Sequence, residues 1–129
     1  MREERRDLTG EVIGVAIEVH RILGPGFLES VYEGAMAVEF KSRKISFERQ
    51  KEIAVTYKKH PVGINRLDFL VENTLVVELK AVASITPLHE AQVLSYLKAT
   101  NCSLALLINF NVPLLKNGIR RIIRSLTPL

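Results

Sequence analysis

Three ionisable residues on either side of Asn73 could do chemistry together. The segments that flank Asn73 alternate between apolar and polar residues, which predicts a β-hairpin with its turn at this asparagine. Because alternate residues of a strand share a face, Glu78 and Lys80 are expected to lie side by side. A three-residue turn centred on Asn73 sets Asp68 opposite Glu78, with side chains about 5 Å apart. The two carboxylates are therefore predicted to converge.

Two converging carboxylates need a cation between or beside them. At that separation their repulsion is about 3 kcal/mol for an effective dielectric constant near 20. Lys80 supplies one positive charge, and a divalent metal ion would supply two. Oxygen ligands without histidine or cysteine favour Mg²⁺ or Mn²⁺ over zinc. A lysine next to such a metal completes the set that hydrolyses a phosphodiester: a Lewis acid, an activated water and a group that stabilises charge.

A surface ladder of ion pairs is the alternative interpretation of the same hairpin. Arg66, Asp68, Glu78 and Lys80 could pair across the strands, each pair contributing a few tenths of a kcal/mol. Spacing alone favours this ladder over a site. The apolar residues that alternate with the charged ones on both strands favour the site, because a core hairpin turns its polar face into a cleft.

A polar stripe follows on the next predicted helix. His89, Gln92 and Tyr96 stand at positions i, i+3 and i+7, opposite the apolar stripe of the same segment. On its own this stripe is typical of a solvated helix face. After a core hairpin that carries charged residues, it is the second wall that a cleft would need.

Periodicity predicts the elements that position these residues. Apolar residues at helical spacing predict three helices, which span residues 9–23, 28–41 and 87–100. Thr9 is expected to cap the first helix, and Gly24-Pro25-Gly26 to end it. Alternation or continuous apolar runs predict strands at residues 45–47, 53–57, 65–72, 74–82 and 103–110. Together they predict an α/β fold, with a central mixed sheet that contains the hairpin and helices on both sides.

The C-terminal segment has two interpretations. Asn117-Gly118 after Leu114-Leu115 is a hairpin signal and favours a short strand. Helical spacing is also present, at Ile119, Ile122, Ile123 and Leu126. The strand is preferred.

Composition limits the class of protein. The 129 residues suffice for one domain, over 1–129, and their 47% hydrophobic and 25% charged residues are typical of a globular chain. No apolar run is long enough to span a membrane and the first residues are charged, so we expect a cytoplasmic protein without membrane contact. Cys102 lies in an apolar run and is expected to be a buried thiol, and the histidine spacing disfavours zinc.

The pattern of basic residues does not indicate a function. The net charge is +4 and the pI is near 9.4, which suits polyanionic partners but is common in proteins that bind none. A solvated charged face accounts for the residues that could contact phosphates, which are Lys58, Lys59, Arg66, Arg120, Arg121 and Arg124.

Four ordered motifs together resemble a known family. Gly26-Phe-Leu-Glu29-Ser-Val-Tyr32 has the form GxxExxY, and Asp68, Glu78-Leu-Lys80 and Gln92-Val-Leu-Ser-Tyr96 follow it. From about Leu8 to Arg124 the chain resembles the GxxExxY proteins, which belong to the PD-(D/E)xK nuclease superfamily and have a restriction-endonuclease-like fold. Leu67 stands where the superfamily commonly has a proline.

The resemblance implies a role for each of these residues. Asp68 and Glu78 would bind the metal ion, and Lys80 would orient or activate the attacking water. Glu29 would be a further metal ligand or the partner of one. Gln92 and Tyr96 match the QxxxY element of the RecB-like branch, which shapes the site and contacts nucleic acid. Ordinary structural roles account for the remaining motif positions: a turn for Gly26, a core position for Tyr32 and helix capping for His20.

The function expected from the sequence is Mg²⁺- or Mn²⁺-dependent hydrolysis of nucleic acid, with DNA as the expected substrate. The first alternative is a non-catalytic module on a nuclease scaffold that binds nucleic acid or serves as a protein adaptor. The presence of Asp68, Glu78 and Lys80 together argues against it. The second alternative is an enzyme that is active only as a homodimer or with a protein partner, because so small a domain has little surface to wrap a duplex.

Overall fold

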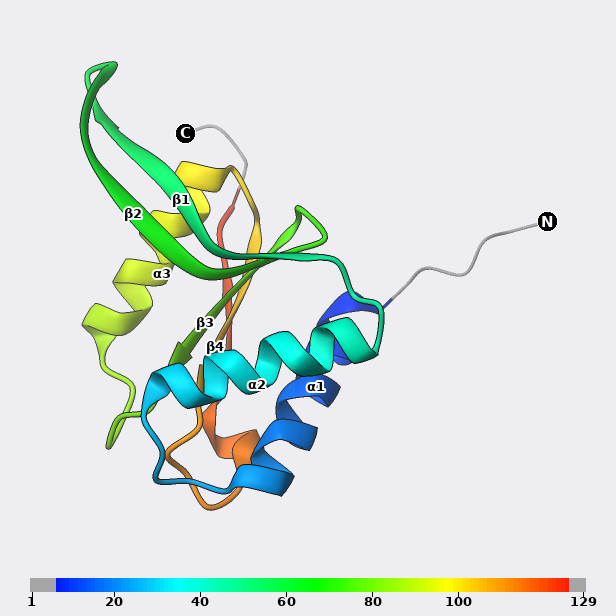
Figure 1. Cartoon of the computed structure of the whole chain (residues 1–129). Coiled ribbons are helices and arrows are strands. Elements are labelled where there is room, and N and C mark those ends of the chain that lie inside the picture. Colours follow the sequence, from blue (N-terminus) through cyan, green and yellow to red (C-terminus); the bar gives the residue numbers. More distant parts are fainter. Residues whose placement is uncertain (1–6, 126–129) are drawn as a thin grey trace.

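A mixed five-stranded sheet forms the centre of the molecule (Figure 1). The computed structural model describes residues 7–125. The elements in chain order are α1 (Leu8–Leu23), α2 (Glu29–Ser42), β1 (Phe47–Tyr57), β2 (His60–Val71), β3 (Leu75–Lys80), α3 (Pro87–Thr100), β4 (Leu104–Asn109), the 3-10 helix η1 (Leu115–Gly118) and β5 (Ile119–Ile123). The strands follow one another across the sheet in chain order. Only the β3–β4 pair of this sheet is parallel, and α3 makes the crossover between these two strands.

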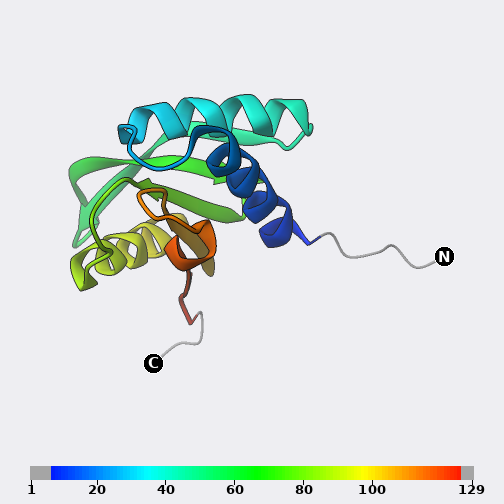
Figure 2. The same cartoon turned by 90° about the horizontal axis from the view of Figure 1, so that it is seen from below.

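Helices cover both faces of the sheet, as the sequence predicts. In Figure 2, α1 and α2 lie on one side of the strands and α3 lies on the other. Each side has its own buried apolar cluster, one built around Tyr32, Phe40 and Phe69 and the other around Leu97 and Leu107. The α/β architecture is that of a restriction-endonuclease-like fold. No helix within residues 7–125 has the length and apolarity that crossing a membrane requires.

Two boundaries at the N-terminal half differ from the prediction. Asp7, and not Thr9, caps α1: its side chain accepts the N–H of Gly10 at 3.0 Å. Phe47 and the predicted strand at 53–57 belong to one strand, β1, whereas residues 45 and 46 precede it. β1 pairs with β2 from Phe47 to Tyr57, except at Gln50 and with a register shift at Val55–Thr56. The polar residues 48–52 belong to β1 as well. All of them except Gln50 pair with β2 through their backbones, and their side chains face solvent or contact other residues.

The C-terminal segment forms the predicted strand by a different route. Asn117-Gly118 does not turn a hairpin; it ends η1, and β5 pairs with β4 rather than with Leu114-Leu115. Gly118 is required by a close approach, because a Cβ there would collide with the carbonyl oxygen of Asn109. Leu126, the last apolar residue of the alternative helix, lies outside the described residues.

The loop between α1 and α2 is fixed by Tyr32 from the core. Gly24 and Gly26 have φ angles of 68° and 107°, which favour glycine. The hydroxyl of Tyr32 donates to the carbonyl of Gly24 at 2.6 Å and accepts the N–H of Phe27 at 3.1 Å. Its ring stacks on Phe110 with centroids 4.5 Å apart. Tyr32 therefore has the structural role expected of it, and through this loop it sets where α2 begins.

His20 does not have the capping role expected of it. Its Nε2 lies 2.8 Å from the carbonyl oxygen of Val112, in the loop after β4. The side chain is 9% exposed and its ring lies beside Phe110. His20 thus ties α1 to the loop after β4. Cys102 is a buried free thiol, as predicted.

We expect Tyr32→Phe to lower the free energy of unfolding by about 1–2 kcal/mol, because it leaves the Gly24 carbonyl and the Phe27 N–H without their partner. Urea unfolding measures the change. Tyr57→Phe removes the same atom from an exposed tyrosine and is the matched control, with an expected change below about 0.5 kcal/mol. Equal effects of the two substitutions would contradict this role of Tyr32.

Candidate functional site

The β2–β3 hairpin has the three-residue turn that the sequence predicts. Glu72 and Asn73 adopt left-handed φ angles of 52° and 58°. The strands pair Val71 with Leu75 and Phe69 with Val77, which is the register centred on Asn73. One step further along, this register sets Asp68 against Glu78.

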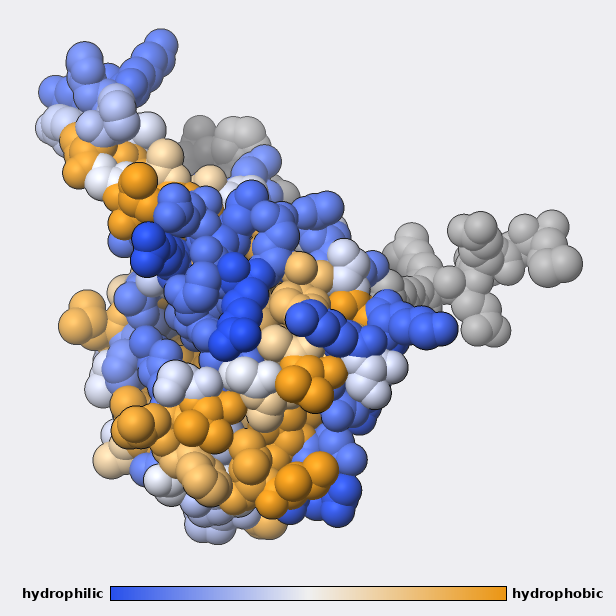
Figure 3. All heavy atoms as spheres, in the orientation of Figure 1, coloured by the Kyte–Doolittle hydropathy of each residue, from blue (hydrophilic) through white to orange (hydrophobic). Residues whose placement is uncertain are grey.

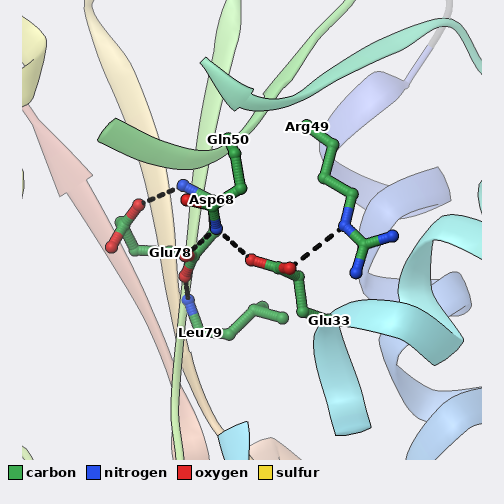
Figure 4. A network of polar contacts seen from close by, with 6 residues as sticks. All are labelled: Glu33, Arg49, Gln50, Asp68, Glu78 and Leu79. Atoms are coloured by element: carbon green, nitrogen blue, oxygen red, sulfur yellow. Dashed lines mark hydrogen bonds and ion pairs between the residues drawn. The ribbon is translucent and has the colours of Figure 1, made fainter. Parts of the chain in front are cut away.

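The backbone ladder between β2 and β3 ends at the pair Phe69–Val77, and carboxylates take its place (Figure 4). The N–H of Asp68 donates to Oε1 of Glu78 at 2.7 Å. In return, the N–H of Leu79 donates to Oδ2 of Asp68 at 2.8 Å. Each carboxylate uses one oxygen in this reciprocal exchange. The second oxygen of Asp68, Oδ1, lies 3.4 Å from Nε2 of Gln50. The exchange holds both carboxylates at the point where the two strands separate.

Both carboxylates are buried, which contradicts the surface ladder of ion pairs. Asp68 is 8% exposed and Glu78 is 4% exposed. Arg66 does not reach either of them; it pairs with Glu52 of β1 at 3.2 Å, where both side chains are more than half exposed. The charged face of the hairpin is therefore divided into a surface pair and a buried pair.

Burial and mutual repulsion make it hard to ionise both groups. Burial raises the pKa of Glu78 to about 8, with a further increase from the charge of Asp68. Burial also raises the pKa of Asp68 to about 6, against the hydrogen bond from Leu79, which lowers it. A divalent cation between them would reverse both effects, because an adjacent positive charge favours the ionised form.

Lys80 and two residues of α3 complete this side of the site. Nζ of Lys80 donates to Oε1 of Gln92 at 3.2 Å. Tyr96 is 5% exposed, and burial raises the pKa of its phenol, with smaller contributions from the charges of Glu78 and Asp68. The phenol therefore lies within electrostatic range of both carboxylates. The predicted polar stripe of α3 faces the hairpin at Gln92 and Tyr96.

Glu29 approaches the same place from the start of α2. Neighbouring atoms desolvate its carboxyl and raise the pKa, although the residue as a whole remains exposed. The charge of Lys80 opposes this increase, so Glu29 and Lys80 are within electrostatic range of each other. Within residues 7–125, Glu29 makes no hydrogen bond to Asp68 or Glu78. It lies at the rim, and it does not join their reciprocal exchange.

The structure adds Glu33 and Gln50, which the sequence analysis did not identify. Glu33 accepts hydrogen bonds from Nε of Arg49, at 3.0 Å, and from Nε2 of Gln50. Nε2 of Gln50 also lies 3.4 Å from Oδ1 of Asp68 (Figure 4). Gln50 thus connects α2 to the buried carboxylate. The available signal for Glu33 was its position one turn after Glu29, whereas Gln50 lay where no strand was expected.

His89, the first residue of the predicted polar stripe, fixes the beginning of α3. Its N–H donates to Oγ1 of Thr86 at 3.3 Å, and its Nδ1 accepts the N–H of Thr86 at 3.1 Å, which makes a capping box. With Nδ1 as the acceptor, the neutral ring carries its proton on Nε2. His89 therefore positions the helix that carries Gln92.

The donor set fits a hard divalent cation with an open coordination sphere. Asp68 and Glu78 offer carboxylate oxygens, and neither histidine nor cysteine takes part. Among the described residues, no group of three or more histidine, cysteine, aspartate or glutamate side chains could hold a metal ion. Mg²⁺ is usually bound through one or two carboxylates, with waters and substrate phosphates at the other positions. The two-carboxylate arrangement is consistent with that mode of binding.

Comparison with known proteins gives a match that covers most of the chain. A family model described as the PD-(D/E)XK nuclease superfamily matches residues 6–122. No curated protein and no solved structure matches the chain significantly.

We expect Glu78→Gln to stabilise the metal-free protein in a pH-dependent way. In the wild type, the folded pKa of about 8 exceeds the ordinary value of 4.5, so the unfolding free energy falls as pH rises through this interval and then levels off. The amide cannot ionise, so between pH 5 and pH 8.5 in EDTA the unfolding free energy of the variant should rise by about 3–4 kcal/mol relative to that of the wild type. Urea unfolding at the two pH values measures this gain.

Glu48→Gln, at an exposed carboxylate, is the control and should show no such gain with pH. If the difference in unfolding free energy between Glu78→Gln and the wild type does not change with pH, the raised pKa of Glu78 is contradicted.

Proposed function

The chain belongs to the PD-(D/E)XK nuclease superfamily, and from this premise we propose that it is a metal-dependent nuclease that hydrolyses phosphodiester bonds of DNA. The observation that carries the proposal is the reciprocal exchange between Asp68 and Glu78, which presents two buried carboxylates at one point. Members of this superfamily are generally nucleases that use divalent metal ions. The motif Gly26-Phe-Leu-Glu29-Ser-Val-Tyr32 supports assignment to the GxxExxY branch.

Asp68 and Glu78 hold the metal ion in this proposal. Their carboxylate oxygens would be its ligands, and the hydrogen bonds from the backbone N–H groups keep both carboxylates oriented. Mg²⁺ or Mn²⁺ bound there would supply Lewis acidity and positive charge for the scissile phosphate. Gln50 limits how far the Asp68 carboxylate can turn away, because it is itself held by Glu33.

Lys80 orients or activates the attacking water in this proposal. Its side chain lies on the same face of β3 as that of Glu78, and its ammonium group donates to Gln92, so it would stand beside a phosphate bound at the two carboxylates. A positive charge there stabilises the negative charge that develops on the phosphate oxygens in the transition state. Gln92 fixes the rotamer of Lys80, and Tyr96 closes the site from the apolar side.

Glu29 completes the site from α2 as a further ligand or as the partner of one. Its place at the rim, in range of Lys80 and near the mouth of the site, is consistent with either role. The two roles can be distinguished, because removing the charge of Glu29 lowers metal affinity only if Glu29 is a ligand.

We expect the wild type to bind Mn²⁺ in a calorimeter, and Asp68→Asn and Glu78→Gln each to weaken that binding by about 10–100-fold or more. Glu48→Gln is the control and should bind like the wild type. If Glu29 is a ligand, Glu29→Gln weakens metal binding as well; if it is a partner, metal binding is kept and cleavage falls. Absence of metal binding by the wild type, even with DNA added, would favour the non-catalytic adaptor.

We expect Lys80→Ala to abolish cleavage of DNA while the free energy of unfolding changes by less than about 1 kcal/mol, since Lys80 is only partly buried. Gel assays on single- and double-stranded DNA with Mg²⁺ measure cleavage, and urea unfolding measures stability. Lys41→Ala, at an exposed lysine of α2, is the matched control and should cleave like the wild type. Wild-type activity in Lys80→Ala would overturn this mechanism.

A further inference from the structure

The outer half of the β1–β2 hairpin, residues 53–65, extends as a two-stranded arm beyond α3 (Figure 1). We call this segment the arm. From Tyr57 to Asn65 every residue of it is exposed. The sequence between Ile53 and Asn65 has no acidic residue, and its charged residues are Lys58 and Lys59 at the tip, next to His60. The arm is thus a long exposed ribbon with a basic end.

The turn at the tip uses residues that do not favour its geometry. Tyr57 pairs with His60, which leaves Lys58 and Lys59 as a two-residue turn with φ angles of 49° and 69°. Such turns favour Asn-Gly, and each residue with a side chain costs about 1–2 kcal/mol in the left-handed region. The two lysines are therefore not explained by the stability of the turn. Strain of this kind is typical of functional positions.

An exposed aromatic residue accompanies these charges. Tyr57 is 63% exposed, and Nζ of Lys58 lies 5.5 Å from the centroid of its ring. In Figure 3 the tip carries hydrophilic residues, with hydrophobic ones directly below it. Cationic and aromatic groups together on an extended element are suited to a nucleic-acid backbone and the groove beside it.

The face of α3 connects the site to the arm. A hollow of about 550 Å³ next to the site is lined by Lys80 and Gln92, among others. A groove of about 720 Å³ lies between the arm and the second half of α3, where Asn65, Ser95 and Lys98 contribute polar groups. Gln92, Ser95 and Lys98 belong to successive turns of α3. Polar side chains of α3 therefore line both hollows, one next to the site and the other at the base of the arm.

The distance along β2 from the site to the tip of the arm corresponds to most of one turn of DNA. Lys59 precedes Asp68 by nine residues along β2, which spans about 30 Å in an extended strand. A DNA duplex rises 3.4 Å per base pair, so this span corresponds to about nine base pairs. The major groove of B-DNA admits a two-stranded β-ribbon, whereas the major groove of an RNA duplex is too narrow to be entered.

We propose that the arm binds duplex DNA, with Lys58 and Lys59 contacting phosphates about nine base pairs from the scissile bond. The duplex lies along α3 from the site to the arm. This assignment rests on the proposed function for the position of the scissile bond, but binding of DNA by the arm does not require cleavage. It makes double-stranded DNA the substrate of the site.

The test replaces the tip with the sequence that its geometry favours. Lys58→Asn with Lys59→Gly removes both charges and relieves the left-handed strain, so the variant should fold with an equal or higher melting temperature. The matched control, Lys41→Gln with Lys116→Gln, removes two charges from exposed positions on α2 and η1. Both variants lose two positive charges, so they differ only in where on the molecule the charges are removed.

Fluorescence anisotropy in EDTA measures binding of a labelled 20-base-pair DNA duplex. The tip variant should bind about tenfold more weakly, and the slope of log K against log salt should fall by about 2, for two lost phosphate contacts. The control should match the wild type. Unchanged affinity and slope in the tip variant would overturn the assignment. Equal binding of an RNA duplex, with the same loss in the tip variant, would overturn duplex DNA as the partner.

Cleavage assays with Mg²⁺ separate the arm from the site. On the 20-base-pair duplex the tip variant should lose about tenfold in kcat/KM, but on a hairpin with a six-base-pair stem, or on bis(4-nitrophenyl) phosphate, it should equal the wild type. An equal loss on the short substrates would overturn the separation between tip and site. If the wild type cleaves nothing and the tip variant still loses DNA binding, the arm is supported and the proposed nuclease function fails.

Discussion

The reciprocal exchange of hydrogen bonds between Asp68 and Glu78 is the interaction on which the rest of the site depends. A strand that leaves its partner exposes unpaired N–H groups, and a buried N–H must find an acceptor. Here the N–H groups of Asp68 and Leu79 find carboxylates rather than carbonyls. The separation of β2 from β3 and the convergence of the two carboxylates are therefore one structural feature. Neither could be kept without the other.

This feature is supported from both faces of the sheet. Tyr32 fixes the loop that begins α2, and α2 in turn brings Glu33 to Gln50 and so to Asp68. On the opposite face, Thr86 and His89 cap α3, the helix whose Gln92 holds Lys80. Polar residues that are positioned by the helices on each face of the sheet therefore contact the buried carboxylates or Lys80. Burial raises the pKa of both carboxyls in spite of this support, and under the proposed function a divalent cation bound to them would lower both values again.

The sequence predicted what depends on local pattern and missed what depends on contacts between distant segments. Asn73 and the alternation around it were sufficient to place Asp68 against Glu78, because a hairpin's register follows from its turn. Gln50 could not be found in this way: it is a polar residue with a positive φ within a strand, and its place is set by Glu33 and Asp68. His20 was assigned to its own helix, but its partner, Val112, is ninety-two residues away. The sequence Asn117-Gly118 is typical of a hairpin turn, but here the glycine allows a close approach to the backbone of Asn109 instead.

Strand β2 has an unfavourable cluster of like charges near each of its ends. The charges are negative at one end and positive at the other. At one end it buries Asp68 beside Glu78, where the charge of Lys80 only partly offsets that of two carboxylates. At the other end the turn before it places Lys58 and Lys59 in left-handed conformations, where positive charge is in excess. Each cluster costs stability in the isolated chain, and neither improves packing. A phosphate backbone with its divalent cation carries both complementary charges in one ligand. A stiff duplex could bring them to both ends of β2 at once, since its charges are spaced along a straight axis. The same strand would then set the distance between the bond that is cut and the contact that holds the substrate.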